Sequence, residues 1–397
     1  MTETTQAGPL KQRFTEIFGT GLAPKIAVAP GRVNLVGEHT DYNEGYVLPM
    51  AIDRCLAACF TPRGDRVLKV HSMDFAETRE FVLPPRTEGA LRQAESGSRS
   101  RWVDYVLGVF LAMQDAGFEV SGINMVLQGD IPIGAGLSSS AALEMAVARA
   151  VCEAFGILWN CAEMARLGQK VENNYIGVSS GIMDQFAATA SLENCALLLD
   201  CRTLKSEPVP IPRDAAIVVM DTGVRRTLSG SAYNERHAAC VRTLNVIRSR
   251  HPQVIALRDV DLDMLEQSRE SLDKATFKRA RHVVEENWRP VQMAEMLRAG
   301  DLAKAGELMK ASHASLRDLY EVSCKELDQI SEQACRHAAC FGARMTGAGF
   351  GGCAVALVQK REVKSFMADV QAGYQAKVDA PSALFECQPS AGARILE

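Results

Sequence analysis

A glycine-rich turn followed by three consecutive serines is the segment of the chain best suited to bind a phosphate group. It lies within residues 129–150, GDIPIGAGLSSSAALEMAVARA. Gly134 and Gly136 let the backbone approach an anion without interference from a Cβ atom, and the serines stand where a helix N-terminus offers unpaired N–H groups. No lysine follows the glycines as in a P-loop, and Ser139 stands where a dinucleotide loop has its third glycine. The segment predicts either another type of phosphate-binding turn or the entry loop of an ordinary helix.

A second group of polar residues lies near the N-terminus, within residues 29–50, APGRVNLVGEHTDYNEGYVLPM. Arg32, Glu38, His39 and Asp41 fall within one glycine-flanked segment, and glycines allow such loops unusual backbone shapes. Alternating donors and acceptors at this spacing suit a ligand rich in hydroxyl groups. A solvated surface turn is the alternative.

The composition is that of a globular enzyme with two domains. The chain has 397 residues, more than one hydrophobic core usually supports. Its net charge of −4, from 44 basic and 48 acidic side chains, gives no reason to expect nucleic acid or an acidic membrane. No apolar run is long enough to span a membrane, and the N-terminus lacks the apolar centre of a signal peptide, so we expect a cytoplasmic protein.

The cysteines point to a reducing compartment. There are 12 of them, scattered without a CxxC pair, and several stand in apolar runs. We expect free thiols that pack as small hydrophobic residues, without a zinc site.

Hydrophobic patterns predict mixed strands and helices in the first half of the chain and mostly helices from Ser231 to about Cys340. The predicted strands are Lys25–Ala29, Tyr46–Ala51, Cys55–Thr61, Val67–Ser72, Ile123–Gln128, Cys195–Asp200, Ala215–Asp221 and Cys353–Val358. The predicted helices are Val103–Ala116, Ser140–Phe155 and Ala162–Tyr175. Residues 95–101, ESGSRSR, predict an exposed loop. The proline-rich segment LKSEPVPIPRD indicates a boundary between an N-terminal domain, 1–207, and a C-terminal domain, 208–397.

The motifs together resemble the galactokinase family of the GHMP kinase superfamily. The resemblance rests on GRVNLVGEHTDY at 31–42, GAGLSSSAA at 134–142 and TGAGFGG at 346–352. GIMDQF at 181–186, RTLSGSAYNERHAAC at 226–240 and SHASLRDLYEVS at 312–323 are also similar. It implies an α+β, two-domain GHMP kinase fold with mixed sheets and helices, an active site in the interdomain cleft, and a chain end that packs back on the first domain.

The resemblance further implies that ATP phosphorylates the anomeric C1 hydroxyl of α-D-galactose. Such a hydroxyl is barely ionised at neutral pH, so a carboxylate against it can accept the proton as the oxygen attacks the γ-phosphorus. Asp184 matches that base, and Arg32 matches the guanidinium that keeps it ionised and stabilises the transferring phosphoryl group. Without the resemblance, Asp184 would be taken for a helix N-cap.

The remaining expected roles also follow from the family match. Magnesium is expected on Ser140 and Glu172, although Glu172 alone would pass for a solvated helical carboxylate. The expected galactose-binding residues are Glu38, His39, Thr40, Asp41, Gly181, Asp184 and Tyr233. The expected ATP-binding residues are Ser72, Trp102, Gly134, Ala135, Gly136, Leu137, Ser138, Ser139 and Ser140. Taken alone, Trp102 would be a core residue and Ser72 part of a turn. The glycines of 346–352 are expected to pack near the phosphate-binding turn rather than to bind ligand.

Two other functions remain open. One is a catalytically silent regulator that binds galactose and ATP to engage a protein partner. The other is a kinase for N-acetylgalactosamine, a uronic acid or mevalonate, although mevalonate kinases lack the GEHTDY segment. A monomer is expected, with an oligomer not excluded.

Overall fold

The computed structural model describes residues 3–85, 102–225 and 229–396, and it has the α+β class expected from the sequence. Its strands are β1 (Lys25–Asn34), β2 (Tyr46–Val47), β3 (Pro49–Pro62), β4 (Val67–Ser72), β5 (Glu77–Val82), β6 (Ile123–Gly129), β7 (Cys195–Asp200), β8 (Ser206–Pro210), β9 (Ala215–Asp221), β10 (Cys340–Met345), β11 (Cys353–Gln359), β12 (Ala383–Cys387) and β13 (Arg394–Leu396). Its helices are α1 (Glu3–Phe18), α3 (Trp102–Asp115), α4 (Ser139–Phe155), α5 (Cys161–Lys170), α6 (Met183–Ala190), α7 (Ser229–Arg248), α8 (Leu262–Gln267), α9 (Lys274–Glu286), α10 (Arg289–Ala299), α11 (Leu302–Ser315), α12 (Lys325–Arg336) and α13 (Val363–Gln375).

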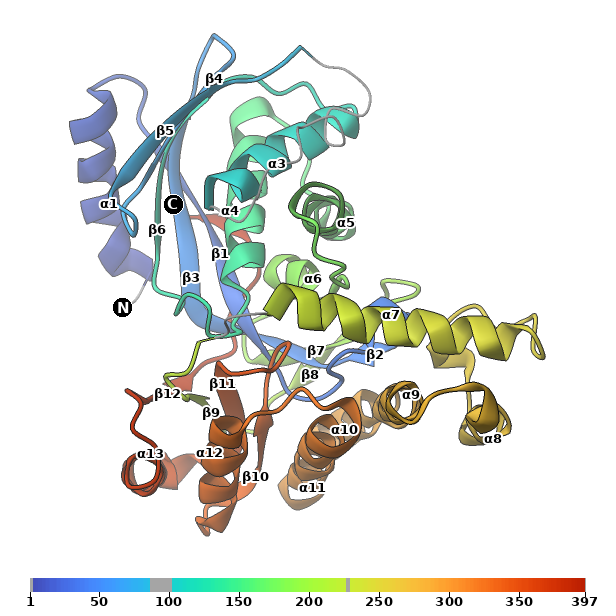
Figure 1. Cartoon of the computed structure of the whole chain (residues 1–397). Helices are drawn as coiled ribbons and strands as arrows, with labels where there is room; N and C mark the ends of the chain where they lie inside the picture. The colour runs from blue at the N-terminus through green and yellow to red at the C-terminus, as the bar shows by residue number, and fades with distance from the viewer. Residues whose placement is uncertain (1–2, 86–101, 226–228, 397) are drawn as a thin grey trace.

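A six-stranded mixed sheet forms the centre of the N-terminal half, in the order β13-β1-β3-β6-β4-β5 (Figure 1). Only β4 and β6 run parallel, and the other neighbours are antiparallel. Helices α3 and α4 cover one face, and α1 covers the other. Helix α4 is rich in alanine and buried along most of its length, so it can pack closely on β1 and β3. This packing places the N-terminus of α4 beside the strand that carries Arg32.

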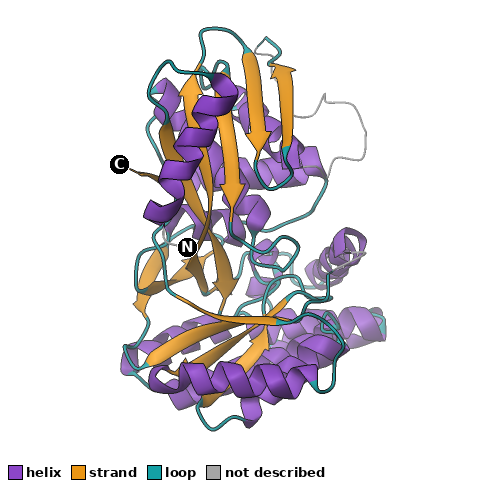
Figure 2. Ribbon diagram, turned by 90° about the vertical axis from the view of Figure 1, so that its left-hand side faces the viewer, coloured by secondary structure: helices purple, strands orange, loops and turns teal. Residues whose placement is uncertain are grey.

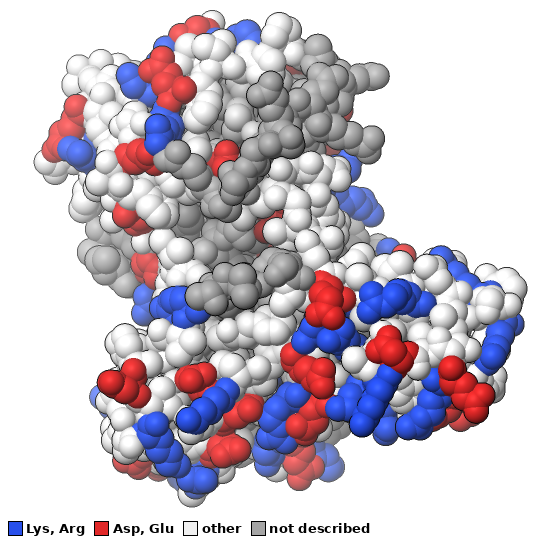
Figure 3. Space-filling model, in the orientation of Figure 1, with Lys and Arg blue, Asp and Glu red and all other residues white. Residues whose placement is uncertain are grey.

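A four-stranded antiparallel sheet, β10-β11-β9-β12, and a layer of helices make up the C-terminal half (Figure 2). The chain then returns to the N-terminal sheet, where β13 pairs with β1 and Ile26 lies opposite Leu396. On the face shown in Figure 3, the basic and acidic side chains of the lower half are interspersed among the described residues.

The two halves share a hydrophobic core. Val33 and Met50 of the first sheet pack in one buried cluster with Ile217 and Val355 of the second. A small sheet, β2-β7-β8, lies beside this cluster. Because the same buried cluster joins the two halves, we expect the position of one half relative to the other to be well defined.

The structure corrects several details of the predicted elements. β3 is one long strand, where two strands were expected on either side of Asp53 and Arg54. The helix expected over Ala162–Tyr175 ends at Lys170 and continues as a π-helical turn, Val171–Ile176. Helix α1 and strand β5 were not expected. Pro9 lies within α1, but Leu10 and Phe14 are buried against the sheet and hold the helix there.

The proline-rich segment contains strand β8, which pairs with β7. An edge strand tolerates Pro208 and Pro210 because one side of its backbone has no ladder to complete. The boundary expected after residue 207 falls inside this strand and stays a prediction. The loop expected over residues 95–101 lies outside the described residues.

Two findings concern the protein's surroundings. In the part of the chain that the structure describes, no helix has both the length and the apolar character required to cross a membrane. The structure describes all twelve cysteines; none of them forms a disulfide, and six are buried. Buried thiols pack as small hydrophobic residues, as in the sequence interpretation.

Candidate active site

A cavity of about 590 Å³ lies where the two halves meet. Its walls come from the β1 region, the turn before α4, the turn before α6, the start of α7 and the glycine-rich loop after β10. The cavity therefore collects residues from five of the six motifs that stood out in the sequence, and residues 312–323 do not line it.

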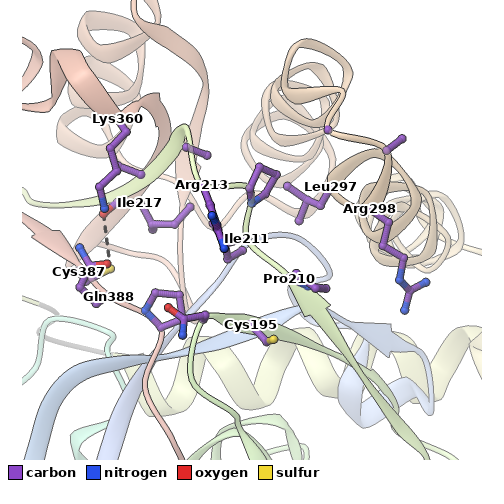
Figure 4. A pocket seen from close by; sticks show the side chains of 17 residues that line it. Cys195, Pro210, Ile211, Arg213, Ile217, Leu297, Arg298, Lys360, Cys387 and Gln388 are labelled. Carbon is purple, nitrogen blue, oxygen red and sulfur yellow. Dashed lines mark hydrogen bonds between the residues drawn. The ribbon is translucent and has the colours of Figure 1, made fainter.

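A larger cavity of about 870 Å³ lies elsewhere, among the ends of β8, α10 and β12 (Figure 4). None of the described residues that line it is a carboxylate or a histidine. Of its basic side chains, Arg298 and Lys360 are paired with Glu207 and Glu386. A site without a proton acceptor is poorly suited to catalysis by a general base.

The turn before α4 has the backbone shape of an anion site. Gly134, Gly136 and Ser138 have φ values of 70°, 81° and 58°, and α4 begins at Ser139. The first N–H groups of a helix have no partner within it, and its dipole favours negative charge there. For a residue with a side chain, the left-handed conformation of Ser138 costs about 1–2 kcal/mol.

The residues of this turn divide between cavity and core. Those that line the cavity are Gly134, Gly136, Ser138, Ser139 and Ser140. The side chains of Ala135 and Leu137 are buried in the core, so only their backbone could reach a ligand. A Cβ atom on Gly352 would lie 2.6 Å from the carbonyl oxygen of Ala135. The second glycine-rich loop thus packs directly on the turn, as we expected.

Asp184 and Arg32 form an ion pair in the cavity, with 2.7 Å between Oδ1 and Nη2. Arg32 is 5% exposed, and its Nη1 also donates to the carbonyl oxygen of Gly136, at 2.8 Å. Asp184 lies inside the first turn of α6, after the N-cap Ile182, so it is not the N-cap itself. The other carboxylate oxygen, Oδ2, accepts a hydrogen bond of 2.5 Å from the Ser138 hydroxyl.

Ser140 and Glu172 face each other, and the Ser140 hydroxyl donates to Glu172 Oε1 at 3.2 Å. Glu172 lies in the π-helical turn and is 8% exposed, so it is not a solvated helical carboxylate. Burial raises its pKa, as does Asp184, while hydrogen bonds from Ser180, Gln185 and Ser140 lower it. A cation there would favour the ionised form.

These two side chains offer hard oxygen ligands, which suit magnesium. No group of three or more His, Cys, Asp or Glu among the described residues could enclose a metal ion. A site with only a serine and a glutamate therefore suits an ion that takes its other ligands from phosphate and water.

The expected sugar-binding residues line the cavity with one exception. The structure brings together Glu38, His39, Asp41, Gly181, Asp184 and Tyr233. Thr40 is fully buried, and its hydroxyl lies 2.9 Å from the Gly37 carbonyl and 2.7 Å from the Tyr46 carbonyl, so it holds the loop together instead. His39 has a φ of 64°, and its Nδ1 lies 2.8 Å from the Tyr42 hydroxyl.

Glu38 is fixed by contacts from the C-terminal half. Its Oε1 accepts a hydrogen bond of 2.7 Å from the Gly347 N–H and lies 3.4 Å from Arg344 Nη2. Burial raises the pKa of Glu38, and Arg344 and Arg32 counteract this. Arg344 is fully buried and also donates to the carbonyl oxygen of Asn34, at 3.0 Å.

Asp41 is held against the turn before α6. A Cβ atom on Gly181 would collide with Asp41 Oδ2, so a larger residue there would force the carboxylate to move. Burial raises the pKa of Asp41 from an ordinary value of 3.8 to about 7, and repulsion from Asp184 adds to this. Hydroxyl groups that donate to Asp41 would favour its ionised form.

Sequence reasoning did not identify three charged residues of the site. Arg225 lines the cavity and forms two hydrogen bonds to Asp221, at 2.7 and 2.8 Å. Glu286 is fully buried and accepts a 2.8 Å hydrogen bond from the Gly37 N–H, which helps to shape the loop that carries Glu38, His39 and Asp41, called the sugar loop after its expected role. Arg344, described above, is the third. Arg225 directly precedes the motif RTLSGSAY, which was the only signal available for it.

A smaller, largely apolar cavity of about 230 Å³ adjoins the turn before α4. It shares Tyr105, Ile133 and Ser140 with the 590 Å³ cavity that contains Asp184. Ser72 and Trp102 both line it, so the structure places them beside the turn. The Trp102 and Phe75 rings stack at 6.3 Å, and Trp102 Nε1 donates to Glu77 Oε2 at 3.1 Å. An apolar slot bordered by aromatic rings suits a flat heterocycle.

Comparison with protein families gives three matches along the chain. Residues 104–191 match the GHMP kinases N terminal domain, and residues 293–376 match the GHMP kinases C terminal model. Residues 12–62 match the galactokinase galactose-binding signature, which includes the loop of Glu38 and Asp41.

Comparison with individual proteins agrees with these matches. The galactokinase of Roseiflexus sp. strain RS-1 is 43% identical over 97% of this chain and 96% of its own length. That of Lactococcus lactis subsp. lactis strain IL1403 is 39% identical over 99% of this chain and 98% of its own length.

Solved structures show the same fold. The crystal structure of Lactococcus lactis galactokinase complexed with galactose has a TM-score of 0.92 and 39% identity, and covers 98% of this chain and 100% of that chain. The Methanococcus jannaschii mevalonate kinase shares the fold alone, with a TM-score of 0.59 and 18% identity over 92% of this chain and 98% of that one. The fold expected from the motifs is thus confirmed, and the chain belongs to the galactokinase family of the GHMP kinases.

Proposed function

We propose that this sugar kinase transfers the γ-phosphoryl group of ATP to the C1 hydroxyl of α-D-galactose, which gives α-D-galactose 1-phosphate and ADP. One observation carries the proposal. Asp184, the candidate base, is held by Arg32 and Ser138 at the point where the sugar loop meets the phosphate-binding turn. Family members use ATP, and this geometry supports a transfer from one side of Asp184 to the other.

The N-terminus of α4 is the proposed site for the phosphates of ATP. Its free N–H groups and dipole would bind the anionic chain. The adjoining apolar cavity, with Ser72 and Trp102, would take the adenine ring. Arg225, whose side chain lies near Gly134, adds a positive charge from the C-terminal half.

The proposed sugar site consists of the polar groups on the other side of Asp184. Glu38, His39, Asp41 and Tyr233 line this part of the cavity, and Gly181 leaves room for the Asp41 carboxylate. Buried donors and acceptors discriminate strongly, because an analogue that lacks a hydroxyl leaves them unpaired. This arrangement would select galactose by its hydroxyl pattern.

In the proposed reaction, Asp184 accepts the proton of the C1 hydroxyl as that oxygen attacks the γ-phosphorus. Arg32 pairs with Asp184 and offers positive charge to the phosphoryl oxygens. Ser140 and Glu172 would hold Mg²⁺, which supplies charge neutralisation on the phosphates when bound. The bond between the γ-phosphorus and the ADP oxygen breaks, and a bond between the γ-phosphorus and the sugar oxygen forms.

Positioning should contribute more than proton abstraction. A general base typically supplies a factor of about 10² to 10⁴ in rate, or roughly 3 to 5.5 kcal/mol. Orientation of two bound reactants can supply about 7 to 11 kcal/mol. The shared core that fixes both walls of the cavity is therefore as relevant to catalysis as the base.

An assay that measures ADP formation with a panel of acceptor substrates tests the function directly. ATP and magnesium would be supplied with galactose, N-acetylgalactosamine, galacturonic acid and mevalonate, and the product analysed by ³¹P NMR. We expect an anomeric phosphate from galactose. Binding of galactose and ATP without turnover would favour the regulator, and preference for another acceptor would favour the related kinase.

Replacement of the base gives a prediction about the mechanism. Asp184→Asn should lower kcat by about 10² to 10⁴, because the amide cannot accept the proton. ATP binding, measured by calorimetry, should persist. Asp263→Asn, which changes an exposed carboxylate on α8, is the matched control and should leave turnover unchanged. An equal loss of ATP affinity in Asp184→Asn would count against its role as a base.

A further inference from the structure

Ser138 departs in two ways from the usual behaviour of a serine before a helix. An N-cap serine normally has extended backbone angles and accepts a hydrogen bond from an N–H of the first turn. Ser138 has φ 58° and ψ 45°, in the left-handed region, and makes no such bond. Its hydroxyl points instead to α6, where it donates to Asp184 Oδ2 at 2.5 Å. A strained conformation of this kind persists only where the surroundings determine it, and such residues cluster at functional sites.

The bond from Ser138 complements the ion pair on the other carboxylate oxygen. Arg32 Nη2 lies 2.7 Å from Asp184 Oδ1. Arg32 is itself tied to the same turn, because its Nη1 donates to the Gly136 carbonyl at 2.8 Å and its backbone N–H donates to the Leu137 carbonyl at 3.1 Å. Both carboxylate oxygens of Asp184 are therefore held from the phosphate-binding turn, one directly by Ser138 and the other through Arg32. A rotation of the carboxylate would break both contacts.

The hydrogen-bonding capacity of a hydroxyl decides what Ser138 can do for a nucleotide. A serine has one O–H donor, and a phosphate oxygen that is ionised only accepts. While the hydroxyl donates to Asp184, it has no proton left for a phosphate. The expected assignment of Ser138 to ATP thus does not fit its side chain, whereas the N-terminal N–H groups of α4 stay available.

We propose that Ser138 is a positioning residue for Asp184, and that its hydroxyl sets the orientation of the base relative to the bound phosphates. The proposal rests on the proposed function, in which Asp184 is the base. The left-handed backbone of Ser138 aims the hydroxyl at α6 and away from the N-terminus of α4. One turn of chain thereby holds the anion and orients the base that works beside it.

Two substitutions separate the hydroxyl from the backbone strain. Ser138→Ala removes the O–H and keeps a side chain in the left-handed conformation, while Ser138→Gly removes both the O–H and the strain. Both should lower kcat by about 10- to 100-fold, because a small misplacement of a catalytic group can cost that much. The KM for ATP should change by less than about threefold, since no nucleotide contact is lost. If Ser138→Ala does not fold, Ser138→Gly provides the same comparison.

A double-mutant cycle with Asp184→Asn shows whether Ser138 acts through Asp184. In the Asp184→Asn background, Ser138→Ala should have little further effect on kcat, because the group that it positions is already inactive. An equal loss in both backgrounds would overturn the proposal, as would a raised KM for ATP with unchanged kcat. The wild-type protein is assayed alongside. Absence of galactose phosphorylation there would refute the proposed function, whereas an active wild type with an unaffected Ser138→Ala refutes only this inference.

Discussion

Among single residues, Asp41 is a carboxylate of the cavity whose surroundings disfavour its ionised form. Burial and repulsion from Asp184 raise its pKa to about 7, and Glu38 adds to the repulsion. The N–H groups of Tyr42 and Met183 counteract this only in part. A carboxylate kept under such conditions is expected where a ligand compensates for it, and sugar hydroxyls that donate to Asp41 would do so.

The raised pKa predicts how stability depends on pH. A carboxylate whose pKa is higher in the folded state contributes stability that is present below its ordinary pKa and is lost as pH rises through the folded value. As the pH rises from 3.8 to about 7, the wild type should therefore lose stability that Asp41→Asn retains. Between pH 5 and 8 the difference should be on the order of 2–3 kcal/mol.

Urea unfolding of both proteins at pH 5, 6, 7 and 8 without sugar measures this difference. Galactose should reduce it, because its hydroxyl donors would stabilise the ionised carboxylate. If the stability of the wild type and of Asp41→Asn changed with pH in the same way, the pKa of Asp41 would not be raised by the fold.

At the scale of elements, the two glycine-rich loops are packed against each other. Gly352 has a φ of 84°, and a Cβ atom there would lie 2.6 Å from the Ala135 carbonyl. At the other end of the same loop, Gly347 donates its N–H to Glu38 Oε1 at 2.7 Å. The loop after β10 therefore touches the phosphate-binding turn at one end and the sugar loop at the other.

This packing predicts the effect of a single methyl group. Gly352→Ala should displace the loop from the turn and reduce kcat and ATP affinity together, by about tenfold or more. Gly156→Ala is the control, because Gly156 also has positive φ, 67°, but a Cβ atom there has nothing within 4 Å. Steady-state kinetics and melting temperatures are measured for both variants. Gly156→Ala reports the effect of backbone strain alone, and any additional loss in Gly352→Ala reports the collision with the turn. Equal losses in both variants would contradict a specific role for the contact.

Elements with a clear period were predictable from the sequence, and those that depend on long-range packing were not. Helices α3 and α4 carry regular apolar patterns and were found within one residue. Strand β3 was divided because Asp53 and Arg54 interrupt its apolar pattern. Helix α1 contains Pro9, and only the burial of Leu10 and Phe14 on the sheet explains it.

The same distinction applies to the site. Asp184, Arg32 and Glu38 belong to short motifs, so the sequence could indicate them as a group. Arg344 and Glu286 are isolated residues of distant elements, and their role is visible only once the C-terminal half packs on the sugar loop. The bond from Ser138 to Asp184 depends on a backbone conformation that no motif specifies.

At the scale of the whole molecule, the two halves are connected by more than a linker. Val33 and Met50 share a core with Ile217 and Val355, and the last strand of the chain completes the N-terminal sheet beside β1. Because β1 carries Arg32, the end of the chain supports the strand from which the ion pair with Asp184 is made. The cleft is therefore a product of the complete fold rather than of either half.

In the proposed reaction, Asp184 takes the proton from the anomeric hydroxyl of galactose beside phosphates bound at α4. A crystal structure with galactose and a non-hydrolysable ATP analogue tests it most directly. We predict a carboxylate oxygen of Asp184 about 2.6–3.2 Å from O1, with the γ-phosphate at the N-terminus of α4. An O1 atom beyond hydrogen-bond distance of Asp184, or phosphates bound away from α4, would contradict this mechanism.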